Sequence, residues 1–291
     1  MKPPPFEYHE PRTINEALDL LARYGGEARP LAGGQSLVAL MNFRLSAPSA
    51  LIDLNRVAEL SYIKEENGRL KFGAMTRQRQ IEFSPLVAQK LPLMTEATAF
   101  IGHLPTRTRG TIGGSIAHAD PSAEYPALVT ALDGEMVIRG KSGERTVKPA
   151  DFFQGFLTTA IQPGEILVEV TIPVTPPKSG WAFEEFARRH GDFAIVEVAA
   201  MVTLDGGGKC KAARLAASGV GATPVKLREV EEIIEKNGLG ERALDEAASR
   251  ASELVDPTTD LHASADYRRH LTRVLTKRAL ARAVARAQKG S

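Results

Sequence analysis

Cysteine is almost absent from this chain: among 291 residues, Cys210 is the single one. A lone thiol cannot form a disulfide within the chain. Zinc and iron–sulfur centres that need several thiolates at defined spacings are excluded for the same reason. If this protein moves electrons, an organic cofactor must carry them in this chain.

Long apolar runs and a strong excess of one charge are missing too. No run approaches the ~18 apolar residues that a membrane-spanning helix needs, and the opening MKPPPFEYHEP has no apolar signal core. The formal net charge is only +2, whereas nucleic-acid binding needs a dense basic face. We therefore expect a soluble, cytoplasmic protein with no membrane span that does not bind nucleic acid.

Motifs for metal binding and for catalysis are scarce as well. The six histidines include no pair at metal-ligand spacing, and His118 near Asp120 has the isolated pattern that seldom marks a ligand. No serine lies in a G-x-S-x-G elbow, and Cys210 lies beside lysines next to a predicted turn. The glycine-rich segments match neither a Walker A motif nor G-x-G-x-x-G. We expect no metal site and no catalytic side chain here.

Helical and extended patterns are mixed up to Pro173. Thr13 and Glu16 have the spacing of a capping box before a helix that ends at Gly25. Further helices are predicted at 37–45, on both sides of Pro92, and from about Pro121 with Asp120 as its cap. Strands are predicted at 51–54, 69–75, 135–140, 145–153 and 165–173.

The stretch VTPPKSG (174–180) is the clearest linker in the chain and indicates a domain boundary. Beyond it the sequence predicts strands at 181–189, 197–204 and 211–221, with a hairpin turn at 205–209. Helices follow at 225–236, 241–254 and 267–287. The last helix carries many arginines, which indicate either a solvated basic face on a docked helix or a subunit contact. Strands followed by helices predict an α+β fold.

Two glycine pairs, Gly33-Gly34 and Gly113-Gly114, each precede a serine and a predicted helix. Glycine lets backbone N–H groups approach an anion, and a helix N-terminus adds unsatisfied donors. Two such loops about eighty residues apart suit a diphosphate gripped from both sides. The alternative from spacing alone is two independent turns with capping serines.

Several segments together resemble a known family. AGGQSL (32–37), TRGTIGGSIAHADPSAEYP (108–126) and RRHGDFA (188–194) are similar to motifs of the FAD-binding medium subunit of the molybdenum hydroxylases, the xanthine dehydrogenase and carbon monoxide dehydrogenase family. The opening FEYHEPRTINEALDLLARYGGEARPLAGGQSL, PGEILVEVTIP, GATPVKLREVEE and YRRHLTRVLTKRAL resemble other landmarks of that family. The resemblance covers essentially the whole chain.

The resemblance implies a domain plan. It implies a two-part FAD-binding domain of the PCMH or vanillyl-alcohol-oxidase type, with subdomains 1–57 and 58–176. A C-terminal domain, 177–291, of the carbon monoxide dehydrogenase flavoprotein type follows, with a three-stranded antiparallel sheet and helices.

The resemblance also implies the cofactor site. Both glycine loops hold the FAD diphosphate and ribityl chain by backbone N–H groups and hydroxyls, and five other positions lie at the flavin ring or line the cofactor. The residues carried over are Leu31, Ala32, Gly33, Gly34, Gln35, Ser36, Leu37, Ile101, Thr111, Ile112, Gly113, Gly114, Ser115, Ala117, Glu124, Ile166 and Phe193. Each of these residues also has an interpretation without a ligand. The glycines would form plain turns, and the hydroxyl residues Ser36, Ser115 and Thr111 would cap helices. Ile101 and Ile166 would be core residues, Phe193 a packed strand residue, and Glu124 a charge in the first turn of a helix.

Three departures from the carbon monoxide dehydrogenase pattern concern this site. Gln35 replaces a histidine, Glu124 an aspartate and Phe193 a tyrosine. Phenylalanine keeps the ring face and loses the hydroxyl, so hydrogen-bonded gating of the flavin is not expected. These departures argue against carbon monoxide as the substrate and leave FAD unaffected.

The resemblance implies partners: a large subunit with a molybdenum cofactor and a small subunit with two [2Fe–2S] clusters, assembled as a dimer of heterotrimers. The chain would pass electrons from a cluster through FAD to an external acceptor. Two alternatives stay open, namely a stand-alone oxidase or reductase with the same FAD-binding fold and a scaffold subunit without flavin. The substrate and the acceptor are not indicated.

Overall fold

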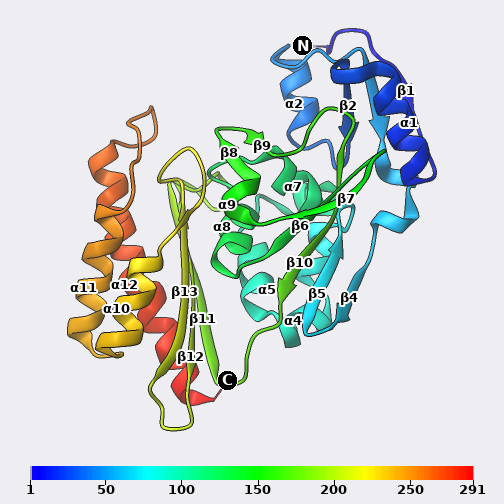
Figure 1. The fold of residues 1–291 in the computed structure, drawn as a ribbon. Helices are drawn as coiled ribbons and strands as arrows, with labels where there is room; N and C mark the ends of the chain where they lie inside the picture. The colour runs from blue at the N-terminus through cyan, green and yellow to red at the C-terminus, as the bar shows by residue number, and fades with distance from the viewer. Residues whose placement is uncertain (1, 291) are drawn as a thin grey trace.

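The computed structural model describes residues 2–290 and shows a mixed α/β architecture (Figure 1). Its N-terminal part is a parallel sheet ordered β1-β3-β2, formed by Glu7–His9, Ala50–Asp53 and Ala28–Leu31. Helices α1 (Ile14–Tyr24) and α2 (Leu37–Asn42) follow β1 and β2. Short 3-10 turns complete this part at Gly25–Glu27, Leu54–Arg56 and Ala58–Leu60.

Helix α1 begins as the sequence predicts. The Thr13 hydroxyl accepts a hydrogen bond from the Glu16 N–H at 3.2 Å. The Glu16 carboxylate accepts from the N–H of Arg12, one residue earlier than a capping box requires. The buried face of α1 then packs against β2 and β3, so the first sheet has a core of its own.

The second part contains an antiparallel sheet ordered β4-β5-β10-β6-β7. Its strands are Ile63–Glu66, Arg69–Gly73, Ile166–Pro173, Glu135–Gly140 and Gly143–Val147. The helices are α3 (Gln78–Glu82), α4 (Pro85–Lys90), α5 (Pro92–Thr98), α6 (Leu104–Arg109), α7 (Ile112–His118), α8 (Glu124–Ala131) and α9 (Pro149–Phe152). A small pair, β8 (Phe153–Gly155) and β9 (Thr158–Thr159), lies beside them.

The third part is an antiparallel sheet covered by three helices. Its strands are β11 (Ser179–Phe186), β12 (Val196–Leu204), β13 (Cys210–Ser218) and β14 (Val225–Lys226). Its helices are α10 (Arg228–Asn237), α11 (Glu241–Glu253) and α12 (Ala265–Lys289). The short β14 makes this a four-stranded sheet, where three strands were expected.

The two faces of this last sheet have different neighbours. Val198 and Ala200 of β12 face the core formed with the C-terminal helices. Ala199 and Met201 belong instead to the core of the second part, together with Leu128 of α8. Because alternate residues of a strand point to opposite faces, β12 is buried on both sides and joins the second part to the third.

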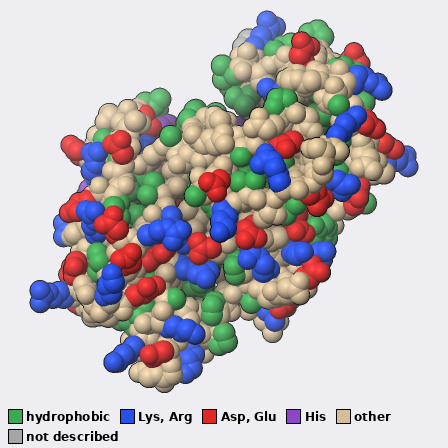
Figure 2. All heavy atoms as spheres, in the orientation of Figure 1, with side chains coloured by type: hydrophobic (Ala, Val, Ile, Leu, Met, Phe, Trp, Pro, Cys, Tyr) green, Lys and Arg blue, Asp and Glu red, His purple; other side chains and the backbone are tan. Residues whose placement is uncertain are grey.

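Helix α12 docks on the sheet by its apolar residues, in agreement with the docked-helix reading. Leu271, Leu275 and Ala279 are buried in the core with β12. Charges of both signs are interspersed over the face drawn in Figure 2. Lys277, for example, lies 2.7 Å from Asp245 of α11. At least this basic residue of α12 is thus paired within the protein.

Several predicted boundaries were wrong for local reasons. The predicted strand at 145–153 is interrupted, because Pro149 starts the short helix α9 after β7 ends. The helix predicted from Pro121 begins at Glu124, because the Asp120 carboxylate accepts from the Ser122 N–H in a turn before the helix. Strands β1 and β4 were not predicted. Helix α2 ends at Asn42, before the predicted end at 45.

Candidate functional site

A cleft of about 840 Å³ lies among the first loop (residues 32–37), helix α7, the turn at residues 101–102 and the segments 161–167 and 191–193. Most of the predicted site residues line it. These are Ala32, Gly33, Gly34, Gln35, Ser36, Leu37, Ile101, Thr111, Gly113, Gly114, Ser115, Ala117, Glu124, Ile166 and Phe193. Leu31 and Ile112 do not line it; Leu31 ends β2 and Ile112 is buried in the core.

The first glycine loop, residues 33–37, offers free hydrogen-bond donors. Within residues 2–290, no acceptor is paired with the backbone N–H of any of these five residues. Gly34 has φ +72°, a conformation that glycine adopts without strain. Ser36 precedes α2 and its side chain makes no cap bond. A run of unpaired N–H groups on consecutive residues is suited to an anion.

The second glycine loop uses its donors within the protein. The N–H groups of Ile112 and Gly113 bond to the carbonyls of Thr76 at 3.1 Å and Ala74 at 2.9 Å. The Gly114 N–H bonds to the Thr111 hydroxyl at 3.0 Å, which makes Thr111 the cap of α7. The Ser115 N–H bonds to the Thr111 carbonyl at 3.1 Å. Because these N–H groups are already bonded, only side chains of this loop have unpaired polar atoms beside the cleft, above all the Ser115 hydroxyl, which has no partner among the described residues.

The glycines of the two loops also let backbone segments approach closely. A Cβ on Gly33 would lie 2.4 Å from the Arg109 carbonyl oxygen. A Cβ on Gly113 would lie 2.5 Å from the Cβ of Ala74. Both distances are shorter than packed atoms allow, so glycine is required at both positions. Close packing thus gives Gly33 and Gly113 a role beside the two that the sequence pattern suggested, ligand contact and a plain turn.

Asn55, in the 3-10 turn Leu54–Arg56, is hydrogen-bonded to the backbone of the first loop. Its side-chain N–H donates to the Ala32 carbonyl at 3.0 Å, and its side-chain oxygen accepts from Arg77. Arg77 also donates to the Arg109 carbonyl, next to the second loop. Asn55 and Arg77 therefore tie the two loops together. Neither residue could be identified from local sequence patterns, because their partners are far away in the chain.

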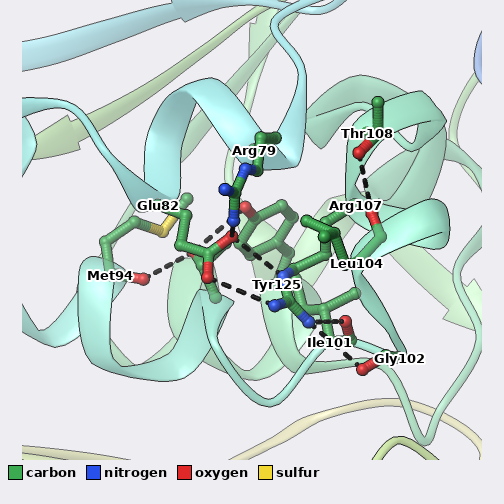
Figure 3. Close-up of polar contacts among 10 residues, drawn as sticks. Arg79, Glu82, Met94, Ile101, Gly102, Leu104, Arg107, Thr108 and Tyr125 are labelled. Carbon is green, nitrogen blue, oxygen red and sulfur yellow. Dashed lines mark hydrogen bonds and ion pairs between the residues drawn. The ribbon is translucent and has the colours of Figure 1, made fainter.

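The apolar wall at Ile101 is held by a buried ion pair (Figure 3). Arg107 donates to the carbonyls of Ile101 at 2.9 Å and Gly102 at 3.2 Å. The same guanidinium group pairs with Glu82 at 2.9 Å, and the side chains of Arg107 and Glu82 are only 11% and 12% exposed. Nothing in the spacing of the motifs pointed to this pair. It fixes the turn that carries Ile101 into the cleft.

The remaining predicted ring contacts differ in exposure. Ile166 is buried at 2% exposed and Ile101 at 7%, whereas Phe193 is 67% exposed at the edge of the cleft. Glu124 begins α8 and is buried; its burial above all raises the pKa of its carboxyl to about 7, and the nearby Asp120 carboxylate adds to this. Of these four residues, three are apolar and one, Glu124, is titratable.

The described part of the chain gives little support for a metal site, a cysteine nucleophile or a membrane-spanning helix. No group of three or more His, Cys, Asp or Glu in residues 2–290 could hold a metal ion. Burial, with a smaller contribution from Glu235, raises the pKa of Cys210 to about 11, so its thiol is a poor nucleophile at neutral pH. None of the described helices is both long enough and apolar enough to cross a membrane.

The geometry first defines a class of protein. A cleft at the upper end of the size range of ligand sites, with apolar walls and a loop of free N–H groups, suits a large organic ligand that carries an anionic group.

Comparison with known proteins is more specific. Residues 4–175 match the family described as the FAD binding domain in molybdopterin dehydrogenase, and residues 181–283 match the CO dehydrogenase flavoprotein C-terminal domain.

Relatives match over nearly their whole length. The chain is 43% identical to the 6-hydroxypseudooxynicotine dehydrogenase complex subunit alpha of Paenarthrobacter nicotinovorans, over 99% of this chain and 97% of that protein. It is 38% identical to the carbon monoxide dehydrogenase medium chain of Afipia carboxidovorans, over 99% of this chain and 100% of that protein.

Solved structures agree with these relatives. A carbon monoxide dehydrogenase structure from Hydrogenophaga pseudoflava, which lacks the Mo-pyranopterin moiety of its cofactor, matches at a TM-score of 0.95 and 38% identity, covering 98% of this chain and 99% of that one. Quinoline 2-oxidoreductase from Pseudomonas putida 86 matches at a TM-score of 0.94 and 38% identity, covering 99% of each chain.

The chain therefore belongs to the FAD-binding medium subunits of the carbon monoxide dehydrogenase and xanthine dehydrogenase family. It is a flavoprotein oxidoreductase subunit, and FAD is its cofactor. The fold prediction, an FAD-binding domain followed by a C-terminal domain of the CO dehydrogenase type, is confirmed.

Proposed function

We propose that this chain passes electrons from an iron–sulfur cluster of a partner subunit through FAD to an external acceptor. The observation that carries the proposal is the run of unpaired N–H groups at residues 33–37, which line a cleft with mostly apolar walls. Flavin chemistry accepts electrons singly and releases them in pairs. The chain's own part is to bind and orient the cofactor.

The residues present fit FAD. The N–H groups of residues 33–37 would hold the diphosphate, since free backbone donors are what an anion requires. Ser115 and Thr111 would contact the ribityl chain through their hydroxyl groups. Ile101, Ile166 and Phe193 would lie against the ring, with Ala117 and Glu124 lining the cofactor nearby. Leu31 and Ile112 would support these residues from behind. The subdomain boundaries at 57 and 176 belong to the same proposal.

The proposed partners are a large molybdenum-cofactor subunit and a small subunit with two [2Fe–2S] clusters, in a dimer of heterotrimers. Supporting relatives are named as a dehydrogenase complex subunit and as a medium chain, and one related structure is of a Cu,Mo-CO dehydrogenase. A cytoplasmic location is proposed with them. Gln35, Glu124 and Phe193 argue against carbon monoxide as the substrate of the assembly.

Two alternatives are less well supported by the geometry. A stand-alone oxidase needs a substrate pocket of its own over the flavin. Here one face of the C-terminal sheet packs into the core of the second part and the other is covered by the C-terminal helices. A scaffold subunit without flavin leaves the free donors of residues 33–37 with no purpose.

An absorption spectrum of the purified chain, alone and after incubation with FAD, tests the proposal. We expect flavin bands near one FAD per chain. A folded sample that binds no flavin in either condition, and also none in the presence of co-expressed partners, would contradict it.

A paired substitution tests the first loop itself. Gly34→Ala forces a Cβ onto a residue with φ +72°, so the loop must distort, and we expect FAD to bind at least about tenfold more weakly. Gly68→Ala is the matched control, because Gly68 has φ +71° in open space in the turn between β4 and β5. Fluorescence titration with FAD measures both. Equal affinities in the two variants would show that loop 33–37 does not hold the cofactor.

A further inference from the structure

Three glutamates from separate segments meet where α8 packs on the C-terminal sheet. Glu185 of β11 and Glu197 of β12 are direct partners in the antiparallel register, and Ser218 of β13 is the partner of Glu197 on its other side. Directly opposite residues have side chains on the same face. That face is the one turned to α8, because Ala199 and Met201 on it share a core with Leu128. Glu124 is the first residue of α8.

Polar atoms in this cluster lack partners. Glu197 is 0% exposed, and neither of its carboxylate oxygens is hydrogen-bonded to any described residue. The same holds for Oε2 of Glu185 and for the hydroxyl of Ser218, which is also 0% exposed. A buried, unpaired carboxylate is far too costly to stay ionised. The geometry therefore requires Glu197 to carry a proton.

The charges around the cluster favour protonation of its other members too. Burial above all, and then Glu124, raise the pKa of Glu185 to about 8. Burial raises the pKa of Glu197 well above its ordinary value, with Glu124, Glu185 and Asp120 adding to it. Arg107 lowers the pKa of Glu124, but it is already paired with Glu82. The groups that face the cluster are thus Glu124 and Asp120 from α8 and the preceding turn, Glu185 from β11, and Arg107 from α6.

The cluster reaches the cofactor cleft through its outer members. Glu124 and Asp120 line the cleft, whereas Glu185 and Glu197 lie behind them. We propose that Glu124, Glu185 and Glu197 form a proton-binding site that opens to the cleft at Glu124 and takes up protons from solvent when the cleft gains negative charge. A negative charge nearby disfavours the ionised carboxylates, so bound protons increase. The proposal deepens the proposed function and rests on it for the identity of the anion, FAD.

The pH dependence of the chain without cofactor tests the site by itself. A carboxyl whose pKa is raised from about 4.5 to about 8 binds more protons in the folded state across that window. Stability therefore falls as the pH rises from about 5 to about 8. Glu185→Gln removes this contribution, and we expect the drop in Tm between pH 6 and pH 8 to shrink by about 4 °C.

Two further variants sharpen this result. Glu197→Gln should flatten the Tm profile at least as much as Glu185→Gln, because the geometry keeps Glu197 protonated in the folded chain while its carboxyl ionises on unfolding, and an amide does not titrate. Asp256→Asn removes a carboxylate whose side chain is fully exposed and is the control, because it should leave the profile unchanged. If Glu197→Gln lowers the Tm, and sodium or potassium chloride raises the wild-type Tm in a saturable way that the variant loses, the cluster holds a cation and the proton-binding proposal is wrong.

Calorimetry of FAD binding tests the coupling to the cleft. Titrations at pH 7.5 in two buffers with different ionisation enthalpies report the protons taken up for each FAD bound. We expect net uptake in the wild type and about twofold less in Glu185→Gln, a variant that does not touch the cleft, at unchanged stoichiometry. Absence of FAD binding would overturn the proposed function while leaving the Tm test valid. Normal binding with equal proton uptake in both proteins, together with parallel Tm profiles, would overturn the proton site.

Discussion

The two glycine loops look alike in sequence and differ in what they do. The loop at residues 33–37 lines the cleft, and its backbone N–H groups have no acceptor among the described residues. The N–H groups of residues 112–115 are bonded to Thr76, Ala74 and Thr111. The free donors of the first loop support the proposed anion site, whereas the bonded donors of the second loop join α7 to the segment after β5. Close packing requires a glycine in both loops, at Gly33 and at Gly113, so the loops differ in the use of their donors.

A glycine pair before a helix therefore does not by itself indicate a ligand site. Its role becomes clear only when the acceptors of the backbone N–H groups are known. A buried backbone N–H must find a partner. At 111–115 the strand-end segment supplies it, so little is left over for a ligand. At 33–37 no described residue supplies it, and a ligand or solvent must. Substitutions should therefore affect the two loops in opposite ways.

The largest effect is expected at Gly113. An added Cβ would lie 2.5 Å from the Cβ and 2.6 Å from the carbonyl oxygen of Ala74, so backbone must move. We expect Gly113→Ala to lower the free energy of unfolding by about 2 kcal/mol. Urea unfolding of the apo chain measures it. Gly155→Ala, whose Cβ meets nothing within 4 Å, is the control. A loss no greater than that of the control would break the assignment of this loop to packing.

Two smaller effects should distinguish the roles of Thr111 and Ser115 in the second loop. Thr111→Ala removes the cap of α7 and should cost about 1 kcal/mol of unfolding free energy. Ser115→Ala should change stability by less than about 0.5 kcal/mol and weaken FAD binding about fivefold, because its hydroxyl has no partner in the described residues. Urea unfolding and fluorescence titration give the two values. Unchanged FAD affinity in Ser115→Ala would remove that residue from the proposed site.

Much of the cleft lining could be predicted from the sequence, because it lies in continuous motifs. AGGQSL and most of the segment from Thr111 to Glu124 line one cleft, and their contacts with FAD stay a prediction. The use of donors in the second loop could not be predicted, since the accepting carbonyls of Ala74 and Thr76 lie in another segment. The partners of Arg107 and Asn55 are equally distant in the chain. The meeting of Glu124, Glu185 and Glu197 depends on strand register, which no local pattern reveals.

The predicted element boundaries were wrong where local chemistry overrode the periodic pattern. The run at 145–153 is rich in β-forming residues, but Pro149 favours the first turn of a helix and β7 ends before it. The helix after Asp120 starts later than expected, because the Asp120 side chain stabilises a turn instead of the helix. In both cases one residue decides the boundary. Periodicity located the elements without locating their ends.

Hydrogen exchange of the backbone amides, measured with and without FAD, tests the contrast between the two loops most directly. We expect amides 33–37 to exchange rapidly in the apo chain and to become protected when FAD binds. Amides 112–115 should be protected in both states, since their acceptors belong to the protein. Amides 33–37 that are already protected without FAD, or that stay unprotected with it bound, would contradict the proposed role of the first loop.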